Sequence, residues 1–439
     1  MTAEPAVISK ALAEACDEVR DGGEGDAGPG PAPTFVAAPG STEQAAAVLR
    51  VAAAHELAVV ARGGGSRLGW GSPPSRCDLV IDTSRMSAVL EHAAGDLVAR
   101  IQAGARMGDV AAVLAQAGQE IAVDVPAGAS VGGVVASGLA GPRRLRYGTP
   151  RDLLIGITVV RADGVIAKSG GKVVKNVAGY DLGKLFAGSA GTLGLITEAT
   201  FRLHPLPAAR AWVTAEYVAV SVACDAVAAA ANSALTASAV ELSRAAPAGP
   251  IRVGVLLEGS AEGVEARAGR MADLLGPAQV TADRPAWWPD APGAAAPDET
   301  LIRVSFWVSA LGWVLDAIES AAVRAGVSAV TEGSAGAGVL YVRVSAPSGP
   351  ADEAGTGDGA VTGDEAGTGA AAFVAALRGA VAGERGGVVV LAAPAAVHGE
   401  LAACGGMNGA VPGLALMRSV KDRFDPGHLM APGRFPETV

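Results

Sequence analysis

Apolar residues near the start of the chain follow first a helical and then an extended spacing. After a capping box formed by Ser41 and Gln44, small and aliphatic residues recur over 45–52 every three or four positions, which predicts a helix over 42–55. The apolar run that follows predicts a strand over 57–61. The ordered part of the chain is therefore expected to open as a β-α-β unit.

Further elements are predicted up to residue 203. Alternating apolar residues indicate strands over 78–82 and 96–103. A helix is expected at about 106–117, where Gly118 suits the residue after a helix end. A strand over 195–203 closes this half of the chain.

The second half alternates strands and helices more regularly, and two such series are typical of ferredoxin-like β-α-β units. The predicted strands lie near 211–218, 250–258, 300–307, 338–346 and 387–392, and the predicted helices near 222–236, 261–275, 309–324 and 371–382. A short helix is expected at about 413–423.

Two segments lack the side chains that a core needs. Residues 1–33 are predicted to be a flexible N-terminal lead-in, because 21–33 consist mainly of glycine, proline, alanine and acidic residues. Residues 347–370 repeat DEAGTG and hold five acidic and no basic side chains, which predicts a mobile loop.

Composition narrows the class of protein. Of 439 residues, 50% are hydrophobic and 18% charged, as in a globular chain. The net charge of −10 argues against a nucleic-acid binder, which needs a basic face. There is no run of about 18 apolar residues and no N-terminal apolar signal segment. We therefore expect a cytoplasmic protein without a transmembrane segment.

Cysteine and histidine give no sign of a metal site. The spacings of Cys16, Cys77, Cys224 and Cys404 fit neither zinc nor iron–sulfur ligation, so reduced structural thiols are expected. The five histidines form no HxH, HxxxH or HExxH pair, and no GxSxG motif supports a serine nucleophile.

Glycine is the outlier of the composition, with 60 residues. The segment RGGGSRLGWG, residues 62–71, follows a predicted strand. Successive glycines let backbone N–H groups converge on an anion such as a pyrophosphate, because no side chain blocks the approach. The spacing matches neither the Rossmann fingerprint nor the Walker A motif. A plain glycine turn between strands would give the same pattern.

Two further segments without bulky side chains, 126–141 and 188–194, favour one extended ligand that lies along the backbone. A lysine cluster lies between them, since four of the six lysines fall within 17 residues. This cluster suits a phosphate site and a solvated face equally well. The four are Lys168, Lys172, Lys175 and Lys184.

The order and spacing of these segments resemble the FAD-binding domain of p-cresol methylhydroxylase/vanillyl-alcohol oxidase-type flavoproteins. The resemblance covers about residues 34–207 and rests on RGGGSRLGWG, PAGASVGGVVASGLAGP, YGTPRDLLIGITVVRADG and KVVKNVAGYDLGKLFAGSAGTLGLITEATFRLHPLP. Within that superfamily, GLAGPRR and KNVAGYDLGKLFAGS look most like the E-type, FAD-binding subunit of bacterial glycolate oxidase.

The resemblance implies an α+β fold. An FAD-binding domain of the p-cresol methylhydroxylase (PCMH) type, made of two α+β subdomains, would occupy 34–207. A ferredoxin-like α+β cap on the substrate side would occupy 208–412. The segment 413–439 would return to the flavin domain, as its KDRFDP and PGR motifs suggest.

FAD is the implied cofactor. Residues 63–66 would cradle its pyrophosphate, 128–133 would lie along the ribityl and isoalloxazine side, and 188–196 would surround the adenosine half and the flavin edge. The predicted FAD-binding residues are Arg62, Gly63, Gly64, Gly65, Ser66, Arg67, Gly69, Pro126, Gly128, Ser130, Gly132, Gly133, Ser137, Gly138, Gly148, Gly188, Gly191, Thr192, Gly194 and Ile196.

The chain departs from the family at three places. Ser66 stands where covalent relatives often carry the histidine that bonds the flavin, which favours non-covalent FAD. Ala431 stands where the family usually has asparagine. The cap holds a single histidine, His398, whereas relatives that oxidise 2-hydroxy acids carry a histidine-rich metal and base cluster.

The implied function is an FAD-dependent oxidoreductase acting on CH–OH donors. It would be the flavin subunit of a glycolate oxidase complex and pass on electrons from glycolate or D-lactate. Its partners would be a second flavin subunit and an iron–sulfur subunit, and the complex would place it peripherally at the inner face of the membrane.

Three alternatives stay open. A self-sufficient 2-hydroxy-acid or alcohol dehydrogenase would need a base such as Tyr147, Lys175 or Tyr180. The others are a non-catalytic flavin-carrying assembly subunit and a nucleotide-sugar-type reductase on the same fold. The sequence identifies neither the substrate nor the catalytic residues.

Overall fold

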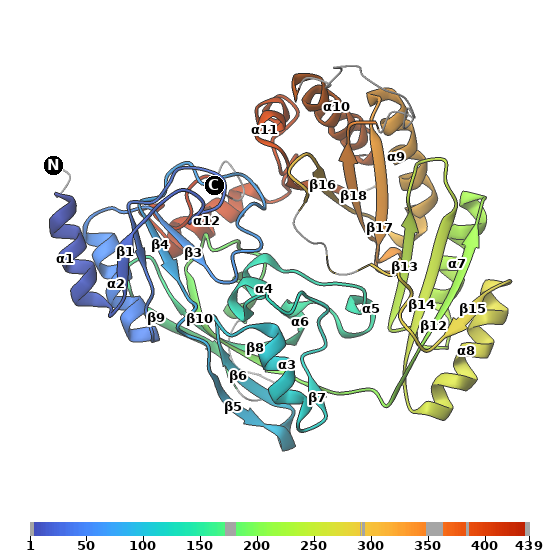
Figure 1. The fold of residues 1–439 in the computed structure, drawn as a ribbon, viewed down its shortest axis with the longest axis horizontal. Coiled ribbons are helices and arrows are strands. Elements are labelled where there is room, and N and C mark those ends of the chain that lie inside the picture. The colour runs from blue at the N-terminus through green and yellow to red at the C-terminus, as the bar shows by residue number, and fades with distance from the viewer. Residues whose placement is uncertain are drawn as a thin grey trace, which may run out of the picture. The chain divides into compact units, whose positions relative to one another are not determined.

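The chain divides into two compact units, each of which mixes helices and sheets (Figure 1). Unit 1 consists of Met1–Ala140, Tyr147–Leu206 and Val411–Val439, and unit 2 of Gly141–Arg146 and Pro207–Ala410. Residues 141–146, expected within the FAD-binding domain, thus belong to unit 2. The computed structural model describes residues 4–171, 181–289, 291, 295–347, 363–382 and 386–434.

The elements of unit 1 are mostly short strands, with helices between several of them. They are α1 (Pro5–Ala15), β1 (Val19–Asp21), β2 (Phe35–Ala37), α2 (Thr42–Ala54), β3 (Val59–Arg62), β4 (Leu79–Asp82), β5 (Val89–Ala93), η1 (Ala94–Asp96), β6 (Val98–Gln102), α3 (Met107–Ala115), β7 (Gln119–Glu120), α4 (Val131–Ser137), α6 (Pro150–Leu153), β8 (Leu154–Val160), β9 (Ile166–Gly170), η2 (Leu182–Leu185), β10 (Leu195–Arg202), β11 (His204–Pro205) and α12 (Leu414–Phe424).

Unit 1 is built on two main sheets. The first has the strand order β1-β2-β4-β3, in which β2, β4 and β3 run parallel and α2 makes the predicted β-α-β crossover. The Ser41 side chain caps α2 by accepting a hydrogen bond from the Gln44 amide at 3.1 Å, as the sequence predicts. The second sheet is antiparallel, with the order β5-β6-β10-β8-β9, and a core of aliphatic side chains joins it to α3 and α4.

The prediction of a flexible lead-in over 1–33 is wrong for the described residues. Pro5 stands in the first turn of α1, where a missing N–H costs nothing, and α1 buries Ile8 and Leu12 in one core with α2. Strand β1 pairs with β2, and Asp26 accepts hydrogen bonds from the Arg20 guanidinium. The polar lead-in is therefore fixed by one small apolar face and by ion pairs.

The elements of unit 2 alternate between strand and helix over most of its length. They are α5 (Arg144–Tyr147, whose last residue belongs to unit 1), β12 (Ala209–Tyr217), α7 (Val220–Asn232), β13 (Ala239–Arg244), β14 (Ile251–Gly259), α8 (Ala261–Leu275), β15 (Gln279–Thr281), β16 (Thr300–Ser305), η3 (Val308–Ala310), α9 (Leu311–Ala325), β17 (Ser328–Gly333), η4 (Ala335–Ala337), β18 (Val339–Ser345), α10 (Gly363–Val381), β19 (Gly387–Ala392) and α11 (Ala395–Ala402).

Unit 2 is organised around one eight-stranded antiparallel sheet with the order β15-β12-β14-β13-β17-β18-β16-β19. The first four strands and α7 and α8 make one β-α-β-β-α-β unit, and the last four with α9 and α10 make a second. These two β-α-β-β-α-β motifs of unit 2 join edge to edge through β13 and β17. The ferredoxin-like cap expected from the alternating pattern is confirmed, and its helices and strands share one apolar core.

Residues 348–362, most of the predicted loop over 347–370, lie outside the described residues. From Gly363 onward the chain is in α10, so the loop prediction is wrong for 363–370. Phe373, Val374 and Leu377 hold this helix in the core of unit 2. None of the helices that the structure describes has the length and apolar character needed to span a membrane.

Candidate functional site

The three glycine segments of the sequence lie together in unit 1. Gly63 and Gly64 follow β3, and a Cβ atom on Gly63 would overlap the Ser130 hydroxyl. Ser130 is the N-cap of α4, and its Oγ accepts hydrogen bonds from the amides of Gly133 at 3.2 Å and Gly64 at 3.1 Å. One buried hydroxyl therefore fastens the first segment to the second.

The third segment lies against the C-terminal end of α4. The amide of Gly188 donates to the Val135 carbonyl at 2.9 Å, and that of Ala190 donates to the Ala136 carbonyl at 2.8 Å. Gly188, Ala190 and Gly191 all have positive φ, which is why this segment needs small residues. The carbonyls that α4 leaves unpaired at its end are thus satisfied by the loop.

Each of the joined segments has a glycine with open space around it. A Cβ atom added to Gly65, Gly128 or Gly188 would meet no atom within 4 Å. In the described part of the chain, the exposed amides of Gly65 and Ser66 donate no hydrogen bond. Gly65 has φ of 76°, so two successive N–H groups lie exposed at a left-handed turn, the geometry of an anion-binding nest. We refer to these three glycines and these two amides as the open surface, and the amides suit a ligand that carries phosphate.

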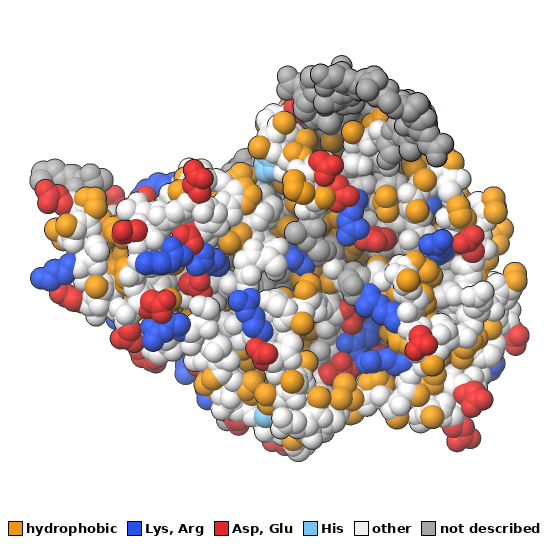
Figure 2. Space-filling model, in the orientation of Figure 1, with side chains coloured by type: hydrophobic (Ala, Val, Ile, Leu, Met, Phe, Trp, Pro, Cys, Tyr) orange, Lys and Arg blue, Asp and Glu red, His pale blue; other side chains and the backbone are white. Residues whose placement is uncertain are grey.

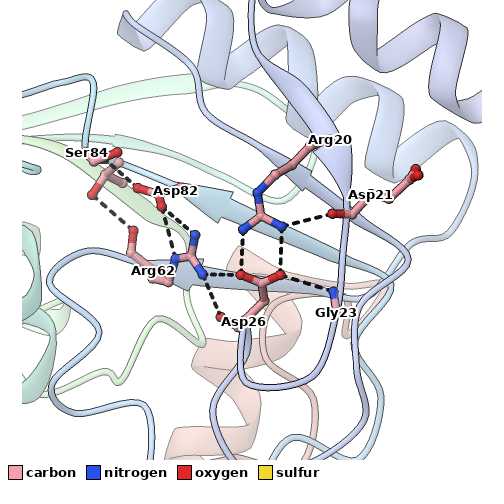
Figure 3. Close-up of polar contacts among 8 residues, drawn as sticks. Arg20, Asp21, Gly23, Asp26, Arg62, Asp82 and Ser84 are labelled. Atoms are coloured by element: carbon pink, nitrogen blue, oxygen red, sulfur yellow. Dashed lines mark hydrogen bonds and ion pairs between the residues drawn. The ribbon is translucent and has the colours of Figure 1, made fainter.

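Arg62, one of the predicted FAD-binding residues, pairs with two carboxylates. Its guanidinium donates to Asp82 Oδ2 at 2.7 Å and to Asp26 Oδ1 at 2.5 Å (Figure 3). Asp26 also pairs with Arg20 at 2.6 Å, and this hydrogen bond, followed by that of Arg62, lowers the pKa of the Asp26 carboxyl. Both carboxylates and both guanidinium groups are paired. Arg62 therefore fixes the start of the first glycine segment, residues 62–71, to Asp26 in the N-terminal lead-in.

The far end of the first segment is held by Arg434. Its Nη2 donates to the carbonyls of Arg67, Leu68 and Trp70, and burial lowers the pKa of Arg434 to about 10. The Arg67 guanidinium stacks over the Trp70 ring at 4.7 Å. Arg67 thus packs along the segment itself.

Lys421 holds the third glycine segment, residues 188–194, in a similar way. Its Nζ donates to Asp425 Oδ2 at 2.6 Å, to the Thr192 carbonyl at 2.7 Å and to the Met430 carbonyl at 2.9 Å. These three acceptors match the three donors of an ammonium group. Burial lowers the pKa of Lys421, and the hydrogen bond to Asp425 opposes that shift. The C-terminal segment therefore holds two of the three glycine segments.

Several predicted site residues have packing or turn contacts within unit 1. Gly132 lies against Ala103 in the core, Gly194 lies against the Val160 carbonyl, and Ile196, a residue of β10, is buried in the core of the second sheet. The others have local contacts. Gly69 lies against Pro29, the Pro126 carbonyl accepts from the Ala129 amide, and the Ser137 hydroxyl donates to the Gly133 carbonyl. Gly138 ends α4 in a left-handed conformation, Gly148 packs on Asp152, a Cβ atom added to Gly191 would lie 3.8 Å from the Ala61 Cβ, and the Thr192 hydroxyl donates to the Ser189 carbonyl.

Lys421, Asp425, Arg434 and Asp26 were not predicted as site residues. The Lys421–Asp425 spacing of four residues near the end of a helix, in a chain with six lysines, was the available signal. Ala431 has φ of 45°, a left-handed conformation that asparagine tolerates better than alanine.

The candidate bases of the self-sufficient alternative are only partly described. The Tyr147 ring packs edge-on against His204 at 4.8 Å, whereas Lys175 and Tyr180 lie outside the described residues. His398, in α11, has its Nε2 3.1 Å from the carbonyl of Ala393, which precedes that helix. Over the described ranges, no three histidine, cysteine or acidic side chains gather in a way that could hold a metal ion.

Comparison with known proteins supports an FAD-binding domain. Residues 33–170 match the family model described as FAD binding domain. The glycolate oxidase subunit GlcD of Bacillus subtilis is 34% identical over 197 residues, 44% of this chain and 42% of that protein. A D-lactate dehydrogenase of Archaeoglobus fulgidus is 35% identical over 173 residues, 39% of this chain and 38% of that one. Each match thus spans about two fifths of the relative's length.

Solved structures show the fold over nearly the whole chain. The p-cresol methylhydroxylase structure has a TM-score of 0.72 at 16% identity, and 98% of this chain and 96% of that one are covered. The 4-ethylphenol oxidase of Gulosibacter chungangensis has a TM-score of 0.70 at 16% identity with the same coverage. The predicted α+β, PCMH-type fold is therefore confirmed.

Proposed function

We propose that this chain, which carries an FAD-binding domain on a p-cresol methylhydroxylase-type fold, is an FAD-linked oxidoreductase that serves the oxidation of a small 2-hydroxy acid. The observation that carries the proposal is the convergence of three glycine segments around one open surface with exposed backbone amides. The names of the relatives, a glycolate oxidase subunit and a D-lactate dehydrogenase, support the substrate class.

The residues at the open surface fit FAD. The amides of Gly65 and Ser66 would hold the pyrophosphate, and the bare backbone at Gly128 and Gly188 would let the rest of the cofactor lie flat. When bound, FAD supplies a two-electron acceptor for the CH–OH group. Ser130, Arg434 and Lys421 keep the segments in place, so the site needs little rearrangement to bind.

We propose that this chain acts in a complex of the glycolate oxidase type, as its E-type flavin subunit. Oxidation of a hydroxyl requires a base, and the cap sequence contains one histidine. The His398 imidazole is 3.1 Å from its neighbouring Ala393 carbonyl, which favours a structural role. A second flavin subunit would then supply the base, and an iron–sulfur subunit would carry the electrons onward.

Anaerobic mixing of the purified, FAD-loaded chain with glycolate or D-lactate tests this division of labour. Alone, the chain should reduce its flavin slowly or not at all, and electron flow to an artificial acceptor should appear when both other subunits are added. Rapid bleaching of the isolated chain, at a turnover near ~10 s⁻¹, would contradict the subunit role and favour the self-sufficient dehydrogenase.

We further expect the flavin to be non-covalent, because Ser66 cannot form the bond that a histidine makes in covalent relatives. After acid precipitation, the yellow absorbance should remain in the supernatant. Flavin fluorescence in the washed, denatured pellet would be inconsistent with this assignment.

A further inference from the structure

The sheet of unit 2 has one face against its helices and one face that carries charged side chains. Along β16, Ile302 and Val304 point into the helical core, so Arg303 between them projects from the opposite face. Arg303 stands directly across from Tyr341 in the register of β16 and β18. Side chains at such directly paired positions are close neighbours.

Arg303 differs from the other arginines of this face. Arg343 pairs with Glu332 at 2.6 Å, and Arg210 pairs with Glu258 at 3.0 Å. In the described part of the chain, the Arg303 side chain makes no hydrogen bond and no ion pair, and its Nε is enclosed without a partner. The Arg303 side chain as a whole is half-buried, so the rest of the guanidinium can be reached from solution. A partly buried cation without an anion is unfavourable, which points to an anion that is not part of the chain.

A second guanidinium lies beside the same tyrosine. Arg144, from the segment 141–146, donates through Nη2 to the Tyr341 hydroxyl at 2.9 Å, and its Cζ lies 6.0 Å from the ring centre. Burial lowers the pKa of Arg303, and the charge of Arg144 adds to this effect. Figure 2 shows basic side chains gathered over α5, the helix that begins at Arg144.

We propose that Arg303, Arg144 and Tyr341 form a binding site for a small organic carboxylate. The planar guanidinium of Arg303 matches the two oxygens of a carboxylate, which it can bind in a bidentate manner. The Tyr341 hydroxyl accepts from Arg144, so its own proton is available to a carboxylate oxygen. The inference deepens the proposed function, on which the choice of 2-hydroxy acids as ligands rests.

Titration calorimetry of the FAD-loaded full chain tests the site, with glycolate and D-lactate as ligands and ethylene glycol and 1,2-propanediol as neutral counterparts. The wild type should bind the acids and not the diols. Arg303→Met should raise the Kd for the acids at least tenfold, and Arg303→Lys should raise it less. Arg252→Met, which removes an exposed arginine paired with Glu216, is the matched control and should bind as the wild type does.

Two outcomes would overturn the inference. One is a wild type that holds FAD but binds neither acid, and the other is an Arg303→Met variant that binds both acids unchanged. A structural arginine would lower the melting temperature on substitution, whereas the removal of an unpaired, half-buried cation should maintain or raise it. FAD content, read from absorbance, is measured separately, so a failure of the flavin assignment is distinguished from a failure of the carboxylate site.

Discussion

Gly128→Leu is expected to abolish FAD binding while the apo-protein stays as stable as the wild type. A Cβ atom at position 128 would meet no protein atom within 4 Å, and Gly128 does not have positive φ, so neither a clash nor backbone strain opposes the leucine. The added side chain would occupy the open surface where the cofactor is expected. We expect the Kd for FAD to rise at least about 100-fold, or about 2.8 kcal/mol.

The measurement is FAD titration by fluorescence quenching, together with urea unfolding of the apo-protein. Gly95→Leu is the matched control, because Gly95 also lies in unit 1, has open space at its Cβ position and does not have positive φ. It should bind FAD normally. Equal FAD affinity in Gly128→Leu and wild type would place the cofactor elsewhere. Substitution of Gly63 would be a poor test, since its Cβ would overlap Ser130 and disrupt the loops themselves.

The glycine segments were predictable from sequence because a backbone that must approach a ligand or adopt positive φ excludes most side chains. The same local argument gave no sign of the ion pairs of Arg62, since a cation next to an anion-binding turn suggests a ligand contact. Its carboxylate partners, Asp82 and Asp26, lie 20 and 36 residues away and are revealed only by the fold.

The paired ferredoxin-like units were also predictable, because alternating strands and helices recur twice with similar spacing. Strands β13 and β17, which join the two β-α-β-β-α-β motifs, escaped prediction because they mix small, polar and aliphatic residues. The placement of 141–146 in unit 2 could not be foreseen either. It depends on contacts such as that of Arg144 with Tyr341, 197 residues away.

Loss of the Lys421 contacts in the C-terminal segment is expected to have the largest effect on stability. Lys421→Met would leave the carboxylate of Asp425 buried without its cation, and the carbonyls of Thr192 and Met430 without a donor. Breaking a buried ion pair on one side usually costs about 3–5 kcal/mol. Because Asp425 also accepts from the amides of Leu429 and Met430, its removal would add further unpaired groups, so the lysine is the cleaner partner to change.

Urea unfolding of Lys421→Met should show a loss of about 3–5 kcal/mol in the free energy of unfolding. Lys10→Met is the natural control, because Lys10 pairs with Glu14 at the same four-residue spacing while both side chains are exposed, at 81% and 71%. An exposed pair of this kind contributes only about 0–1 kcal/mol. Since Lys421 holds the third glycine segment through Thr192, FAD affinity should fall with it. Similar losses in the two variants would mean that the Lys421 pair gives unit 1 no more than a surface contact does.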